Sequence, residues 1–216
     1  PDNTSLLLKF YTIYRELEQE KADPPEVFLQ WAPGLMRDFD EMDAHMVSSE
    51  ALFGYLQDVK YIESWNPEGQ SLTRGQEEYL AFFGKLRLYH QKFTDYLLEN
   101  SLAYQGLSAG MAARRIESGS FLLPWEKVIF AGFNALTKAE EVIIDHLIRE
   151  GIAEYHPDAD QWYANNPEQE AGRFVSAYMK RWKAFPEKAE NYFGEENKSI
   201  RIFGIAKNVN QARLAG

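Results

Sequence analysis

The stretch Lys127–Tyr163 constrains the fold most, because strand and helix signals alternate within one short segment. Its four apolar residues Val128–Ala131 favour a buried strand. Thr137 can cap an amphipathic helix that runs to Glu150, and a second strand is expected at Ile152–Tyr155. This order predicts a β-α-β unit with parallel strands. The unbroken apolar run also predicts that both faces of the first strand are covered.

Functional side chains of such units sit where strands end and helices begin. The first predicted strand ends in Ala131-Gly132-Phe133-Asn134, which contains no carboxylate. The sequence therefore predicts that the position where chemistry is expected lacks an acidic catalytic group.

The first 120 residues carry helical patterns, with apolar side chains at spacings of three and four. Helices are expected from Ser5 through Leu17, from Pro25 to Met46 with a break at Pro33-Gly34, from Ser49 through Ile62, from Arg74 to Asn100, and over Ser108–Glu117. Ser5 is the expected cap of the first helix, and Thr73 caps the fourth in a capping box with Gln76.

The predicted fold class is α/β, with a mainly helical subdomain over residues 1–120 packed on a partial parallel sheet layer over 121–216. The second part also contains a predicted helix at Glu168–Lys183 and a third predicted strand at Ser199–Ile205. A last helix is expected to start at Asn208 or Asn210.

Composition excludes several function classes. The chain has no run of about 18 apolar residues, so a membrane span is not expected. It has no cysteine, which removes disulfides and thiolate sites and is compatible with a reducing, cytoplasmic setting. The net charge of −10 argues against binding of a nucleic-acid phosphate backbone by this chain alone. Residues 171–216 are nevertheless basic, because they contain 9 Lys/Arg and 4 Asp/Glu, a net charge of +5. Within them, the candidate DNA-binding residues are Lys180, Arg181, Lys183 and Arg201.

The densest polar cluster is Asp38-Phe39-Asp40-Glu41-Met42-Asp43-Ala44-His45. Asp38, Asp40 and Asp43 with His45 could be interpreted as a metal site, and a metal-dependent hydrolase is one alternative function. On a helix, however, residues two apart diverge by about 200°. A solvated or partner-facing helix face is the favoured interpretation.

Other motifs of chemistry are absent from the sequence. There is no Gly-x-x-x-x-Gly-Lys-Ser/Thr phosphate loop, so an independent ATPase is not expected. There is no Gly-x-Ser-x-Gly elbow and no His-Glu-x-x-His pair. His90 and His146 are interpreted as packed or surface histidines. We therefore expect no catalytic, cofactor-binding or metal-binding residue in this chain.

The segment Val128–Tyr163 resembles a degenerate superfamily 1 helicase core. Active members end the strand in Asp-Glu-x-Gln, which handles magnesium and the attacking water, and Ala131-Gly132-Phe133-Asn134 stands there in this chain. A later Gly-Asp-x-x-Gln-Ser-Ile-Tyr stretch couples nucleotide to DNA. His156-Pro157-Asp158-Ala159-Asp160-Gln161-Trp162-Tyr163 occupies that place, keeping an acidic residue and the final Tyr163.

More specifically, the chain resembles the AddB/RexB-type subunit of RecBCD-like helicase–nuclease complexes. The resemblance is carried by Trp31, Asp38-Phe39-Asp40-Glu41-Met42-Asp43, Leu52-Phe53, the segment Phe130–Glu140, the strand Ile200–Ile205, and Gln211-Ala212. It implies an internal, inactivated part of a longer subunit with a RecA-like (P-loop-type) sheet and a helicase 1B-like helical insertion.

The resemblance implies a role as scaffold and DNA-path wall in an ATP-dependent exonuclease and helicase complex for double-strand break repair. The implied partners are an AddA/RexA-like motor subunit and, within the full complex, DNA; no membrane is expected. ATP and magnesium are expected only in the motor subunit and in a nuclease domain of the parent protein. The parent is then an enzyme and this chain is not. A free-standing helical protein-interaction module is the alternative, favoured if the three predicted strands do not form one parallel sheet.

Overall fold

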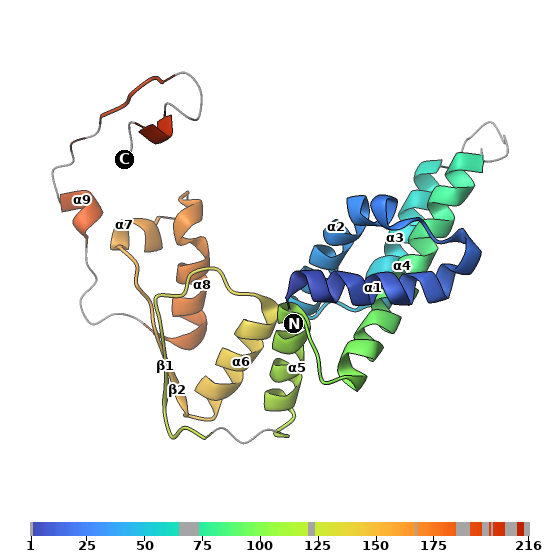
Figure 1. The fold of residues 1–216 in the computed structure, drawn as a ribbon. Helices are drawn as coiled ribbons and strands as arrows, with labels where there is room; N and C mark the ends of the chain where they lie inside the picture. The colour runs from blue at the N-terminus through green and yellow to red at the C-terminus, as the bar shows by residue number, and fades with distance from the viewer. Residues whose placement is uncertain are drawn as a thin grey trace. The chain divides into compact units, whose positions relative to one another are not determined.

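The structure is a computed structural model that describes residues 2–64, 74–120, 124–166, 168–184, 191–195, 199, 201–205 and 211–213. It is mainly helical with a small two-stranded parallel sheet (Figure 1). The chain divides into two compact units. Unit 1 comprises residues 1–130 and 135–155, and unit 2 comprises residues 131–134 and 156–216. This division differs from the expected one at residue 120, because the β-α-β segment packs with the helices that precede it.

In the part of unit 1 that the structure describes, five helices precede the sheet: α1 Asn3–Glu18, α2 Pro25–Ala44, α3 Ser49–Ser64, α4 Arg74–Glu99 and α5 Gln105–Glu117. Its core is aromatic. The fully buried ring of Phe10 contacts rings from α2 and α4, namely Phe28, Trp31, Phe39, Tyr89 and Phe93. Aromatic residues at helical spacing therefore form the core here, because each ring removes a large apolar area from water.

Two predicted details of the helices are wrong. The cap of α1 is Asp2, whose carboxylate accepts a hydrogen bond from the Ser5 amide at 2.7 Å, so Ser5 lies inside the helix. The predicted break at Pro33 does not occur, since α2 is continuous. Proline has no N–H, so the backbone carbonyl four residues before Pro33 loses its hydrogen bond within the helix. Because Pro33 is exposed, water can reach this carbonyl, and the buried apolar face of α2 continues on both sides of Pro33. The predicted cap at Thr73 lies outside the described residues.

The β-α-β prediction is confirmed, with β1 at Val128–Ala131, α6 at Lys138–Arg149 and β2 at Ala153–His156. Thr137 caps α6 in a reciprocal capping box with Glu140. The amide of Val128 donates to the carbonyl of Ile152 at 2.9 Å.

One face of this sheet packs on α5 and α6, through the buried residues Ile116, Leu147 and Ala153. The expectation that both faces of the first strand are covered is wrong, because Ile129 is 59% exposed. Consecutive apolar residues indicated burial on both sides, but the described elements of unit 1 leave Ile129 on the second face exposed.

Unit 2 contains the short helices α7 Gln161–Ala164 and α9 Tyr192–Glu195, a 3₁₀ turn at Glu170–Gly172, and α8 Arg173–Trp182. The predicted third strand is not formed by its described residues, Ser199 and Arg201–Ile205. Ile202 and Phe203 are 92% and 63% exposed, so no strand among the described residues packs beside these β-favouring side chains. The predicted last helix falls largely on residues outside the described ranges. None of the described helices has the length and hydropathy needed to cross a membrane.

Candidate functional site

The residues that correspond to the helicase motifs all lie in unit 2. At the end of β1, Gly132 has a φ of 74°, a conformation that glycine adopts without a steric penalty. Its amide donates to the carbonyl of His156 at 3.1 Å, which joins the strand end to the start of the second motif. Ala131, Phe133 and Asn134 are exposed. The strand end therefore presents a methyl group, an aromatic ring and an amide, and it offers no carboxylate to a metal ion.

The acidic residues of the second motif have different surroundings. Asp160 caps α7, because one carboxylate oxygen accepts from the amide of Trp162 and the other from the amide of Phe193, both at 2.8 Å. Asp158 is exposed. The ring of Tyr163 lies 5.0 Å from Trp162 and 5.1 Å from Phe193. Asp160 and Tyr163 thus stabilise the packing of α7 against α9 within unit 2.

The four candidate DNA-binding residues fall into two groups. Lys180 and Arg181 are exposed in the last turn of α8, and Lys183 follows directly in a left-handed conformation with a φ of 53°. Arg201 is exposed on a separate segment without regular secondary structure. The structure therefore gathers the first three at one helix end and does not show Arg201 joining them.

The acidic cluster of α2 is divided between different neighbours. Asp43 accepts hydrogen bonds from the phenol of Tyr104 and from Nε2 of His90, the latter at 3.1 Å. Asp40 Oδ1 accepts from the amide of Gly106 at 2.7 Å, where α5 begins. Asp38 instead lines an apolar groove between α2, α3 and α4. The carboxylates thus do not converge. In the described part of the chain, no group of three or more His, Asp or Glu side chains is placed to hold a metal ion.

Burial explains the electrostatics of this cluster. Burial is the main cause that raises the pKa of Tyr104, and the charge and hydrogen bond of Asp43 add to it. Tyr104 therefore remains a protonated donor at neutral pH. His90 is 7% exposed, and its Nδ1 atom is buried without a hydrogen-bond partner among the described residues. The sequence-based interpretation of His90 as a packed histidine is confirmed by this burial.

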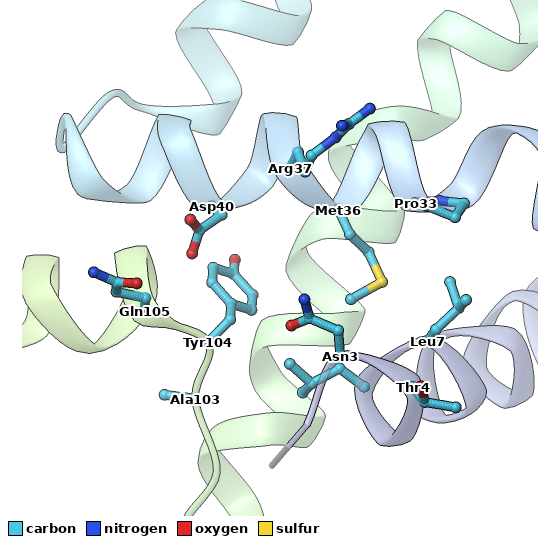
Figure 2. Close-up of a pocket in the computed structure, with 11 residues that line it drawn as sticks. Asn3, Thr4, Leu7, Pro33, Met36, Arg37, Asp40, Ala103, Tyr104 and Gln105 are labelled. Carbon is cyan, nitrogen blue, oxygen red and sulfur yellow. The ribbon is translucent and has the colours of Figure 1, made fainter. Parts of the chain in front are cut away.

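A groove of about 650 Å³ adjoins Asp40 and Tyr104 (Figure 2). Residues of α1, α2 and the α4–α5 connection line it, and Figure 2 shows the Asp40 carboxylate beside the phenol ring of Tyr104. Because the Asp40 and Asp43 carboxylates already accept hydrogen bonds from α5 and its preceding residue, they stabilise the crossing of α2 and α5.

Two further polar clusters, both partly buried, were not predicted from the sequence. Glu18 accepts from Tyr89 at 2.6 Å and from Lys85 at 2.5 Å. Burial alone would raise the pKa of Glu18, but the hydrogen bonds of Lys85 and Tyr89 and the charges of Lys85 and Lys21 outweigh it, so that this pKa is lowered. The sequence signal was a carboxylate in the last turn of an apolar helix.

The second cluster surrounds Asp23. Its carboxylate accepts from the phenol of Tyr14 at 3.1 Å and from Nε1 of Trp31 at 3.3 Å. In the sequence, Asp23 falls between the first two expected helices. A carboxylate at a helix junction that follows an aromatic-rich helix is the signal that could have found it.

Comparison of the chain with models of known families, with curated proteins and with solved structures gave no match. The assignment of a function therefore depends on the geometry described above and on the sequence resemblance.

Proposed function

We propose that this chain is a non-catalytic, helicase-like part of an AddB/RexB-type subunit in a cytoplasmic ATP-dependent exonuclease and helicase complex. It acts as scaffold and DNA-path wall during the processing of double-strand breaks. ATP, magnesium and nuclease chemistry belong to an AddA/RexA-like motor subunit and to another domain of the parent protein. The observation that carries the proposal is the end of β1, where a parallel β-α-β unit presents Ala131-Gly132-Phe133-Asn134 in place of carboxylates.

The open face of the sheet supports a place in a larger assembly. Parallel sheets occur almost only where both faces are covered. Here α5 and α6 cover one face, and Ile129 projects from the other with 59% of its surface exposed. A further layer over Ile129, contributed by the parent subunit or its partner, would complete the sheet.

A pair of variants tests this role. Ile129→Glu places a charge on the open face, and it should abolish association with the parent subunit or motor subunit in size-exclusion chromatography. Leu8→Glu is the matched control, because Leu8 on α1 is similarly exposed at 62%. Both variants should fold, since surface substitutions usually change stability by no more than about 0.5 kcal/mol. ATP hydrolysis by the purified chain would contradict the proposal.

The second candidate is a free-standing helical protein-interaction module. It is favoured by one observation: the described residues of the predicted third strand do not join the sheet. The same variants separate the two candidates. Association that survives Ile129→Glu and is lost with Leu8→Glu would place the interaction on the helical part and support the module.

A further inference from the structure

Helix α8 has one buried face and one charged face. Val175 and Tyr178 are buried, and the Tyr178 ring stacks on Trp182 at 4.9 Å. A second set of residues lies on the opposite side of the helix, because its members are one, three, three and one positions apart in the sequence. This set, which we call the α8 strip, consists of Arg173, Phe174, Ala177, Lys180 and Arg181, all of them exposed.

The strip is positive although the chain is acidic. Residues 171–183 contain four cations and no Asp or Glu, whereas the whole chain carries −10. The nearest acidic residue before the helix, Glu170, belongs to the preceding 3₁₀ turn. A polyanion therefore matches the charge of this face better than that of the chain as a whole.

Helix stability does not account for the composition of the strip. Lys180 and Arg181 lie in the last turn, where cations interact favourably with the helix dipole. Arg173 lies in the first turn, where a cation is unfavourable by the same argument. Phe174 gains little from burial, because it is 44% exposed. Two of the five positions thus work against the stability of the helix or contribute little to it.

We propose that the α8 strip binds single-stranded DNA. Arg173, Lys180 and Arg181 contact phosphates, and one base stacks on the ring of Phe174. Ala177 lies between these residues on the helix, and its small side chain leaves space for the DNA backbone. Proteins that bind single strands combine this same pair of features, cations along the backbone and an aromatic ring for a base. The choice of DNA rests on the proposed function, whereas the choice of a single strand rests on Phe174, because a duplex offers no unstacked base.

The test is fluorescence anisotropy of a labelled oligothymidine with the full chain over a salt series. Phe174→Ala should weaken binding by about 5- to 150-fold, the range expected from the loss of one stacked base, and Phe174→Tyr should retain it. The triple variant R173Q/K180Q/R181Q should reduce the slope of log affinity against log salt by about 2. Circular dichroism confirms that each variant keeps its helices.

The matched control removes the same charge elsewhere. K92Q/R114Q/R149Q neutralises three exposed cations of unit 1 and should leave both affinity and slope nearly unchanged. Equal losses from the two triple variants, or no effect of Phe174→Ala, would overturn the proposal. Tighter binding of a duplex, an oligouridine or an acidic peptide than of oligothymidine would overturn it as well.

The outcome is separable from that of the proposed function. Oligothymidine binding through the strip without association with a motor subunit would overturn the assembly role and leave the strip in place. Association that depends on Ile129, without oligothymidine binding at low salt, would overturn only the strip.

Discussion

At the scale of single residues, Asp43 joins three parts of unit 1 through one carboxylate. It lies on α2, and its partners are His90 of α4 and Tyr104 at the start of α5. The Asp43 side chain is 12% exposed, so these hydrogen bonds are largely shielded from water. Asp43, which the sequence suggested as a possible metal ligand, therefore stabilises the packing of the helices in unit 1.

The first prediction concerns this carboxylate. Asp43→Ala removes the acceptor that the Tyr104 hydroxyl and His90 Nε2 share and leaves these two groups only their 3.5 Å contact with each other, so it should lower the free energy of unfolding by about 2–4 kcal/mol. Urea unfolding followed by circular dichroism measures the change. Asp38→Ala is the control, because Asp38 is exposed on the same helix, and it should change stability by no more than about 0.5 kcal/mol. Equal effects of the two variants would show that the Asp43 cluster is not a stabilising one.

The second prediction concerns Tyr14 at alkaline pH. Burial, with the charge and side chain of Asp23 adding to it, raises the pKa of Tyr14 from 10.0 to about 12, although the Asp23 amide opposes the shift. The unfolded chain then loses this proton first, so the stabilising contribution is present below pH 10 and is lost as the pH rises towards 12. Tyr14→Phe should make the urea midpoint fall less steeply across this range.

The control for Tyr14 is Tyr55→Phe, since Tyr55 is 66% exposed. This variant should reproduce the pH dependence of the parent chain. An unchanged slope in Tyr14→Phe would mean that Tyr14 ionises alike in the folded and unfolded states.

At the scale of elements, the crossing of α2 and α5 depends on Gly106. A Cβ atom at this position would lie 1.9 Å from the carbonyl oxygen of Asp40, a backbone atom that cannot move aside. The Gly106 amide also donates to the Asp40 side chain. The absence of a side chain thus permits both the close approach of the helices and the hydrogen bond between them.

The third prediction follows from this contact. Gly106→Ala should destabilise unit 1 by about 1–3 kcal/mol or more, because α5 must move away from α2. Gly34→Ala, within α2, meets nothing within 4 Å and should instead stabilise by about 0.5–1 kcal/mol. Thermal unfolding of both variants gives the comparison. A stabilising Gly106→Ala would contradict the close crossing.

The elements that could be predicted are those that depend on local signals. Thr137 and its capping box begin α6, β1 is a short apolar run that ends at Gly132, and β2 follows the end of α6 at Gly151 with alternating buried and exposed residues. The third strand could not be predicted from local signals, because Ile202 and Phe203 favour strands but a strand forms only beside a neighbouring strand that local sequence does not reveal. Likewise, Asp43, His90 and Tyr104 are far apart in sequence, and only the packing of α2, α4 and α5 brings them together.

At the scale of the whole molecule, the buried core is unevenly divided. Nearly all buried apolar side chains of the described residues belong to unit 1; in unit 2 they are Val175 and Tyr178. Since burial of apolar surface is the main stabilising term, unit 2 should open at a lower free energy than unit 1. A single two-state unfolding free energy should therefore not describe this chain.

Hydrogen exchange with mass spectrometry tests this last prediction. Amides of α8 should exchange before those of α1, α2 and α4, and the difference should narrow as urea approaches the global transition. Tyr178→Ala should speed exchange in α8 and leave α2 unchanged, whereas Phe39→Ala should speed exchange across unit 1, because Phe39 is fully buried among the rings of the aromatic core. Identical protection of α2 and α8 in the parent chain would mean that both units unfold together. In that case the small core of unit 2 would have to draw its stability from unit 1.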